Sequence, residues 1–172
     1  MNLILCGMMG AGKSTVGKKI ADLTGRVWCD TDEWIVANHG NIADIFKTYG
    51  EAYFRRLERE TVDVLAKKDG LIISTGGGLV LARENCVRLQ ENGKIVFLRA
   101  QLKTLEERLT ADNSRPLLQA ETGTLVERLT SLLNARAPIY EQVSDYIVDV
   151  DGKSLEEIAD EIILKLPIGE KI

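Results

Sequence analysis

The sequence predicts an α/β fold in which a parallel sheet lies between helices on both faces. Short apolar runs recur along the 172 residues, and segments with apolar residues at helical spacing separate them. Strands that alternate with helices form crossover units of a parallel sheet. The runs are apolar throughout, as expected for parallel strands that are buried on both faces. The expected strands are residues 3–6, 27–29, 71–73, 95–98 and 146–148.

Length and composition limit the classes of protein to consider. With 172 residues, 45% of them apolar, the chain is expected to form one domain with a proper core. Its net charge of -4 argues against nucleic acid as a partner, because such a surface would be basic. No apolar run reaches the roughly 20 residues of a membrane span, and no signal peptide is recognisable. We expect a cytoplasmic monomer, since no exposed apolar helix face is left unassigned.

Three cysteines, Cys6, Cys29 and Cys86, are scattered along the chain. The first two fall in expected buried strands and are interpreted as small core residues in a reducing compartment, not as a disulfide or metal framework. A catalytic thiol is the alternative. It is disfavoured because only one histidine, His39, is present to activate it.

The first expected strand runs into a phosphate-binding loop. Residues 7–15 read G-M-M-G-A-G-K-S-T and match G-x-x-x-x-G-K-S. The strand before the loop and the helical spacing after it supply the required context, which disfavours a glycine turn that binds nothing. Backbone N–H groups and a helix N-terminus would face the phosphates of a nucleoside triphosphate such as ATP. Lys13 would reach the outer phosphates and Ser14 would bind Mg²⁺. The residues predicted to hold the nucleotide here are Gly10, Ala11, Gly12, Lys13, Ser14 and Thr15.

The second expected strand ends in Asp30-Thr31-Asp32. Ligands of open parallel sheets bind beyond the C-terminal strand ends, so both carboxylates should lie at the edge that carries the phosphate loop. Asp32 also fits the N-cap of the helix that follows. The third strand is followed by Ser74 and Thr75, where an aspartate would usually serve the metal, so Asp30 becomes the candidate metal carboxylate, through water.

A long helical segment, residues 41–67, follows and contains a glycine that suggests a bend at Gly50. Arg55 and Glu58 lie three residues apart, so they share a helix face and can pair. A solvated charged face is the ordinary interpretation of such a run. The alternative is that Glu58 holds Arg55 in place to bind an anionic substrate.

The third strand runs into Gly76-Gly77-Gly78 at the same sheet edge. Three consecutive glycines are entropically costly, which indicates that another group approaches the backbone closely. A simple turn into a helix is the alternative.

Residues 112–122 are expected to form a surface flap, because polar turn formers and Arg115-Pro116 interrupt the helical pattern. A flap beside a phosphoryl-transfer site would exclude water, and an arginine on it would stabilise the moving phosphoryl group. An ordinary loop with a solvated arginine is the alternative. The next helix is expected to end near residues 136–140, and Ser154 with Glu157 predicts a capping box for the last one.

In combination, these motifs make the chain resemble the shikimate kinase family, part of the nucleoside-monophosphate-kinase-like group. The resemblance rests on the phosphate loop, D-T-D at 30–32, F-R-x-x-E ending at Glu58, G-G-G at 76–78, R-P-L-L at 115–118 and R-x-x-x-Y at 136–140. It implies a five-stranded parallel sheet of the P-loop NTPase fold. It also implies one kinase domain over residues 1–172, with a substrate-binding helical region about 32–60 and a mobile lid about 112–122.

The resemblance further implies the reaction and the roles of residues. ATP, with Mg²⁺, would phosphorylate the 3-hydroxyl of shikimate in the chorismate pathway. Lys13, Asp32 and Arg115 would be catalytic, and Ser14 and Asp30 (through water) would hold the metal. Arg108, Arg115 and Lys153 would join the loop in binding the nucleotide. The implied substrate-binding residues are Asp32, Arg55, Gly76, Gly77, Gly78 and Arg136, with Glu58 positioning Arg55.

Two alternatives remain open at this point. Another small-molecule kinase of the same fold, acting on gluconate or a nucleoside monophosphate, would also use arginines for an anionic substrate. A GTP-dependent switch protein is more distant, because the D-x-x-G matches at residues 22–25 and 149–152 fall at unsuitable places and residues 66–69 lack the asparagine of N-K-x-D.

Overall fold

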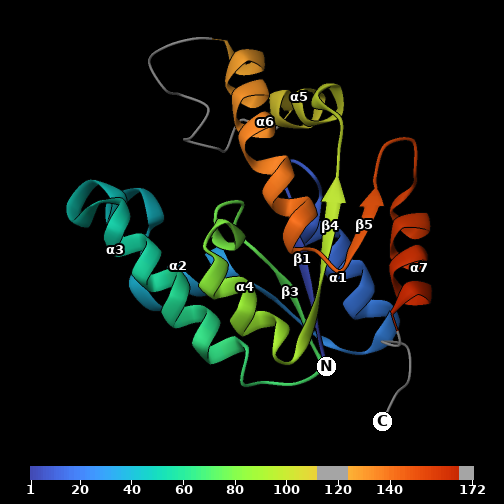
Figure 1. Cartoon of the computed structure of the whole chain (residues 1–172), viewed down its shortest axis with the longest axis horizontal. Helices are drawn as coiled ribbons and strands as arrows, with labels where there is room; N and C mark the ends of the chain where they lie inside the picture. The colour runs from blue at the N-terminus through green and yellow to red at the C-terminus, as the bar shows by residue number, and fades with distance from the viewer. Residues whose placement is uncertain (112–123, 167–172) are drawn as a thin grey trace.

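The structure is a computed structural model of the chain, and it describes residues 1–111 and 124–166. Five parallel strands form one sheet in the order β2-β3-β1-β4-β5 (Figure 1). All five expected strands are confirmed, and each extends slightly beyond its predicted bounds. They are β1 (Asn2–Cys6), β2 (Val27–Asp30), β3 (Leu71–Ser74), β4 (Gly93–Arg99) and β5 (Tyr146–Asp149).

Helices cover both faces of the sheet, which confirms the predicted fold class. Helices α1 and α7 pack against each other on one face, and α4 and α6 lie on the other (Figure 1). The helical elements are α1 (Lys13–Thr24), α2 (Thr31–His39), α3 (Ile42–Leu65), the 3-10 turn η1 (Leu79–Leu81), α4 (Arg83–Gln90), α5 (Leu102–Ala111), α6 (Leu125–Val143) and α7 (Leu155–Lys165). Within the described ranges, no helix is long and apolar enough to cross a membrane.

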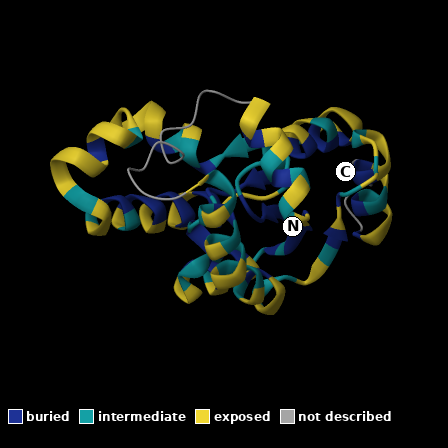
Figure 2. Ribbon diagram, turned by 90° about the horizontal axis from the view of Figure 1, so that it is seen from above, coloured by how far each residue is buried: buried dark blue, intermediate teal, exposed yellow. Residues whose placement is uncertain are grey.

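The buried side chains form two clusters. The larger surrounds β1, β3 and β4, whose apolar residues are almost fully buried between the helix layers (Figure 2). The smaller one consists of Ile35, Ile45, Phe54 and Leu57 and packs α2 against α3 beside the sheet. This second cluster gives the α2–α3 region a packed base of its own.

Strand β2 differs from the prediction that every strand is buried on both faces. It lies at the edge of the sheet with only β3 as a neighbour, so Val27 is 66% exposed and Cys29 is half-buried.

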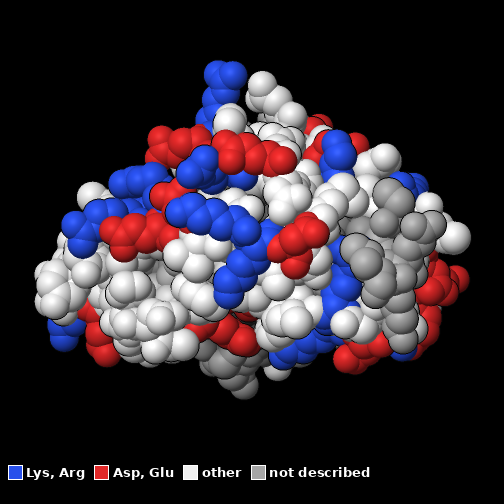
Figure 3. Space-filling model, turned by 90° about the horizontal axis from the view of Figure 1, so that it is seen from below, with Lys and Arg blue, Asp and Glu red and all other residues white. Residues whose placement is uncertain are grey.

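On the face drawn in Figure 3, Lys and Arg side chains lie interspersed with Asp and Glu.

Two helix predictions are decided by backbone geometry. The bend at Gly50 is confirmed: its φ of 78° and ψ of 175° interrupt α3. The predicted end of a helix near residues 136–140 is wrong, because α6 continues through Pro138 to Val143. A proline removes one intrahelical hydrogen bond, and the burial of Tyr140 in the core holds the following turn in place. Arg136 and Tyr140 therefore lie one turn apart on the same face of α6.

Candidate active site

The phosphate loop connects β1 to α1 and has a backbone that only glycine adopts readily. Gly10 and Gly12 have φ of 80° and 96°, in the left-handed region. At Gly7 an added Cβ would lie 2.7 Å from the Leu98 carbonyl oxygen, so this position also requires glycine for space. No side chain caps the first turn of α1, which leaves its N–H groups available to an anion.

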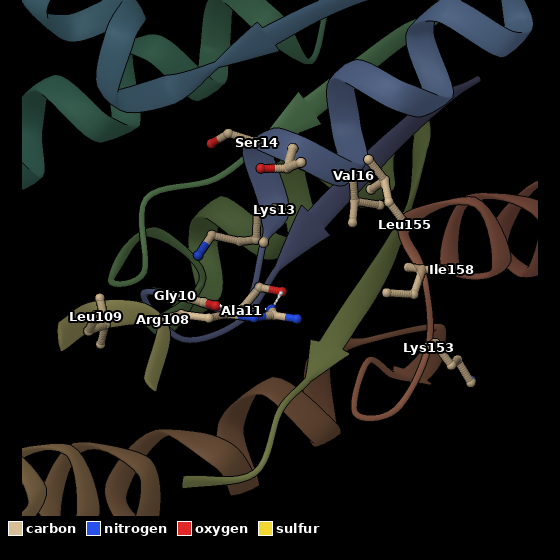
Figure 4. Close-up of a pocket in the computed structure, with 12 residues that line it drawn as sticks. Gly10, Ala11, Lys13, Ser14, Val16, Arg108, Leu109, Lys153, Leu155 and Ile158 are labelled. Carbon is tan, nitrogen blue, oxygen red and sulfur yellow. Dashed lines mark hydrogen bonds between the residues drawn. The ribbon is translucent and has the colours of Figure 1, made fainter. Parts of the chain in front are cut away.

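Lys13 lies across the loop. Its Nζ donates to the carbonyl oxygens of Gly7 and Met8, both at 2.9 Å (side chain in Figure 4). The α1 N-terminus is fixed from below by Ser74, whose hydroxyl donates to the Lys13 carbonyl oxygen at 2.9 Å and accepts from Trp28 Nε1 at 3.0 Å. Ser74 stands where an aspartate would usually serve the metal, and here its hydroxyl holds the loop in place.

Asp30 connects the phosphate loop to α2. Its Oδ2 accepts from the Ser14 hydroxyl at 2.8 Å, and its Oδ1 accepts from the backbone N–H groups of Asp32 and Glu33. Asp30 is therefore the N-cap of α2, and the alternative that Asp32 caps this helix is wrong. The reason is that the helix begins at Thr31, two residues earlier than a cap at Asp32 would require.

Ser14 and Asp30 suit Mg²⁺ better than they suit a metal ion that is coordinated by protein side chains alone. Among residues 1–111 and 124–166, no group of three His, Cys, Asp or Glu side chains gathers to bind an ion. Mg²⁺ keeps several waters and is bound through one or two carboxylates and substrate phosphates. One hydroxyl and one carboxylate beside a phosphate loop fit that donor set.

A cavity of about 350 Å³ opens over the loop (Figure 4). Residues 10–16 of the loop and α1 form one wall, Arg108 and Leu109 of α5 form another, and Lys153, Leu155 and Ile158 form the third. Arg108 Nη1 donates to the carbonyl oxygens of Gly10 and Ala11 at 3.2 and 3.1 Å. All predicted nucleotide residues within the described chain therefore meet at one cavity.

Two aspects of this cavity differ from expectation. The Lys153 ammonium group pairs with Glu161 at 2.6 Å, so the side chain already has an acidic partner. The apolar wall of Leu109, Leu155 and Ile158 was not predicted. Arg115 and the expected flap at 112–122 lie outside the described residues.

The three glycines after β3 are in close contact with three side chains from three helices. A Cβ on Gly76 would lie 2.5 Å from Asp32 Oδ1, one on Gly77 would lie 3.5 Å from Arg136 Nη1, and one on Gly78 would lie 2.6 Å from Arg55 Nη1. The prediction that other groups approach this turn closely is confirmed. The alternative, a simple turn into a helix, describes the end of this segment, because Gly78 leads directly into the 3-10 turn η1. One carboxylate and two guanidinium groups thus converge here.

Hydrogen bonds hold the glycine turn beside the phosphate loop. The Gly76 N–H donates to Thr31 Oγ1 at 2.8 Å, and the Thr75 N–H donates to the Leu5 carbonyl oxygen at 3.0 Å. The Tyr140 hydroxyl donates to the Gly77 carbonyl oxygen at 2.5 Å. Tyr140 is fully buried, and burial raises its pKa to about 12, so the phenol keeps its proton as a donor. Sequence reasoning gave Tyr140 no role, although its place one turn after Arg136 was a usable signal.

Arg55 is held by two glutamates. Its Nη1 donates to Glu58 Oε2 at 2.8 Å, which confirms the predicted pair. Glu51, which was not predicted, accepts from Nε at 3.2 Å and Nη2 at 2.9 Å. Burial lowers the pKa of Arg55, but hydrogen bonds to Glu58 and Glu51 outweigh this and leave it raised. The ordinary solvated-face interpretation holds for Arg56 and Arg59, which form exposed pairs.

Burial raises the pKa of Glu58 above its usual value, and the hydrogen bond from Arg55 offsets only part of that rise. Glu58 is 2% exposed, so its cost of desolvation is high without the arginine. A buried carboxylate of this kind anchors Arg55 firmly from one side.

The three cysteines are not poised as nucleophiles, although Cys6 directly precedes the phosphate loop and Cys29 directly precedes Asp30. Burial raises the pKa of the Cys6 thiol to about 12 and that of Cys86 to about 11, so both are protonated near neutral pH. Burial also raises the pKa of Cys29. A thiolate nucleophile is therefore not supported at any of the three positions.

Substitution of Gly78 by alanine is expected to raise the KM for the anionic substrate about tenfold or more, because a small misplacement of a binding group has large kinetic effects. The new Cβ would push the Arg55 guanidinium from its position. Since the displaced atom is the end of a flexible side chain, the free energy of unfolding should change by less than about 1 kcal/mol. Steady-state kinetics and thermal unfolding measure the two quantities.

Gly77→Ala is the matched control for this substitution. Its Cβ would meet Arg136 Nη1 at 3.5 Å, an ordinary contact distance, so its KM should rise much less. Equal effects of the two alanines would show that loss of glycine flexibility, and not the displacement of Arg55, is responsible.

The chain is similar to known proteins in sequence and in structure. The model of the family described as shikimate kinase matches residues 9–167. A shikimate kinase of Xylella fastidiosa (strain 9a5c) is 43% identical over 166 residues, which are 96% of this chain and 91% of that protein. The structure of shikimate kinase from Acinetobacter baumannii in complex with shikimate aligns with a TM-score of 0.88 at 34% identity, covering 99% of this chain and 95% of that one.

A gluconokinase from Sinorhizobium meliloti 1021 aligns with a TM-score of 0.66 at 21% identity, over 95% of this chain and 89% of that one. This likeness extends to the fold alone. The family match, in contrast, covers residues 9–15 of the phosphate loop and the glycine turn. The identity of about 40% extends over nearly the full chain. The chain belongs to the shikimate kinase family.

Proposed function

We propose that this protein transfers the γ-phosphoryl group of ATP to the 3-hydroxyl of shikimate, giving shikimate 3-phosphate and ADP. The observation that carries the proposal is the convergence of Asp32, Arg55 and Arg136 on one glycine turn, which hydrogen bonds hold beside the phosphate loop. The hydroxyl oxygen forms a bond to the γ-phosphorus, the bond from that phosphorus to the β–γ bridging oxygen breaks, and the hydroxyl proton leaves.

The substrate side of the site matches a polyhydroxylated carboxylate. Guanidinium groups bind carboxylates through paired hydrogen bonds, which assigns the shikimate carboxylate to Arg55 and Arg136. The Gly77 backbone adds a further contact. Because Gly76 and Gly78 have no side chains, Asp32 and Arg55 can lie close to the backbone of the turn. Asp32 accepts hydrogen bonds from ring hydroxyls and takes the proton of the attacking one.

The donor side supplies positioning and positive charge. Phosphoryl transfer needs in-line geometry and neutralisation of the charge on the equatorial oxygens. The loop N–H groups, Lys13 and Arg115 provide that neutralisation, while Arg108 and the residues near Lys153 face the base. Ser14 and, through water, Asp30 would hold Mg²⁺, which would supply positive charge to neutralise the phosphate oxygens.

The two alternatives find less support. The resemblance to a gluconokinase is one of fold alone. The D-x-x-G match at residues 149–152 has structural contacts: Asp149 pairs with Arg99, and Asp151 accepts from the Gln101 N–H and the Thr104 hydroxyl. These contacts connect β5 and the segment after it to the end of β4 and the start of α5.

An ADP-release assay across shikimate, gluconate and nucleoside monophosphates tests the proposal. We expect turnover with shikimate and almost none with the other acceptors. The ring of shikimate holds its carboxylate and its hydroxyls at a fixed separation that can span the two arginines and Asp32, whereas gluconate is a flexible chain that loses more entropy on binding and a nucleoside monophosphate has no carboxylate. Strong turnover with gluconate and none with shikimate would contradict the proposal.

A further inference from the structure

We propose that Glu51 limits the affinity of the site for its anionic substrate by competing with the substrate carboxylate for Arg55. This inference rests on the proposed function, in which Arg55 binds that carboxylate. It makes Glu51 an internal competitor whose removal should tighten substrate binding, whereas a residue that merely supported Arg55 would loosen binding when removed.

The hydrogen bonds of Arg55 define the competition. Glu51 Oε1 accepts from both Nε and Nη2, at 3.2 and 2.9 Å, and so occupies the side edge of the guanidinium plane. That edge is one of those that match a carboxylate through two parallel N–H groups. A substrate carboxylate that takes this edge must replace Glu51, and one that takes the neighbouring edge must lie close to its negative charge.

The two glutamates around Arg55 differ in how firmly they are held. The Glu58 side chain is 2% exposed, and the Glu51 side chain is 64% exposed. Exposed ion pairs of this type contribute about 0–1 kcal/mol, so Glu51 leaves its position easily. Because Glu58 holds the Arg55 guanidinium group in place, the substrate carboxylate can replace Glu51 without moving that group.

The backbone gives Glu51 a favourable place after displacement. Gly50 interrupts α3 directly before it, so Glu51 opens the second half of the helix. A carboxylate in the first turn of a helix is stabilised by the exposed N–H groups and the helix dipole. Release of Arg55 therefore does not leave the Glu51 charge unsupported.

Charge balance gives the direction of the effect. Burial is the main cause of the raised pKa of Glu58, and the negative charges of Asp32 and Glu51 near Arg55 raise it further. An arriving carboxylate adds a further negative charge to this group. Removal of the most exposed of the three acids reduces the repulsion without removing the buried anchor.

The test replaces Glu51 by glutamine, whose amide oxygen still accepts from Arg55 while the charge is lost. Titration calorimetry with shikimate alone, and KM measured at saturating ATP, should both show affinity rising about three- to tenfold, as loss of one like charge a few ångströms away implies. The KM for ATP should stay the same. Glu60→Gln is the matched control, because Glu60 forms an i, i+4 pair with Arg56 on the same helix, 55% exposed on both sides, and contacts no proposed site residue.

The outcomes separate the two proposals. An unchanged or weaker affinity for shikimate in Glu51→Gln overturns the competition, since Glu51 would then be neutral or would position Arg55. An equal gain in Glu60→Gln also overturns it, because the gain would come from net charge alone. Turnover of shikimate by the unaltered protein reports on the proposed function independently of either variant.

Discussion

Replacement of Asp32 by asparagine is expected to lower kcat with shikimate about a thousandfold, within the range usual for a lost general base. Asparagine has nearly the same shape, so it fits against Gly76 as the carboxylate does. It cannot accept the proton of the attacking hydroxyl. Affinity for ATP should remain nearly unchanged, because the nucleotide cavity is lined by other residues. Single-turnover kinetics and calorimetry with ATP measure these two effects.

The structure removes one ambiguity from this experiment. Asp30, not Asp32, caps α2, so the substitution leaves the helix start intact and a loss of activity is not explained by unfolding of α2. Glu33→Gln, at the next and exposed position of the same helix, is the control and should keep full activity. Normal turnover by Asp32→Asn would show that the carboxylate at this position is dispensable.

Replacement of Arg136 by alanine is expected to raise the KM for shikimate about a hundredfold, in line with the loss of one partner of a desolvated charge pair. Arg136 projects from α6 towards Gly77, where an added Cβ would lie 3.5 Å from its Nη1. The KM for ATP should change less than about threefold, since no wall of the nucleotide cavity includes Arg136. Steady-state kinetics with each substrate varied in turn measures the contrast.

Two further variants serve as controls for the Arg136→Ala experiment. Arg136→Lys keeps the charge but loses the planar fork, so its KM for shikimate should lie between those of the unaltered protein and the alanine variant. Arg56→Ala removes an exposed arginine from α3 and should leave both KM values unchanged. Equal increases for shikimate and ATP in Arg136→Ala would assign the residue to the scaffold.

Much of the fold was predictable because its signals are local. Each strand is a short apolar run, and the phosphate loop carries its own glycines, lysine and serine in nine consecutive residues. The bend at Gly50, the Arg55–Glu58 pair and the capping box of Ser154 with Glu157 also depend on neighbours within a few residues. Such features follow from backbone geometry and helix spacing, which sequence patterns record directly.

The errors arose where distant packing decides local structure. Strand β2 has an apolar pattern but lies at the edge, because the strand order places it there. Helix α6 passes through Pro138 because Tyr140 is buried against Phe97, with ring centroids 5.2 Å apart. The second glutamate on Arg55 is a different case, because Glu51 lies four residues before Arg55 on the same helix and its i, i+4 spacing was a usable local signal.

The sequence by itself determined the alternation of strands and helices, the phosphate loop and the set of charged residues that suits an anionic substrate. Only the tertiary structure decided that Gly76, Gly77 and Gly78 face Asp32, Arg136 and Arg55 in turn. These side chains come from three helices that precede and follow the turn in the chain. Their meeting depends on how α2, α3 and α6 pack around the end of β3, and packing between distant segments leaves no periodic trace in a single sequence.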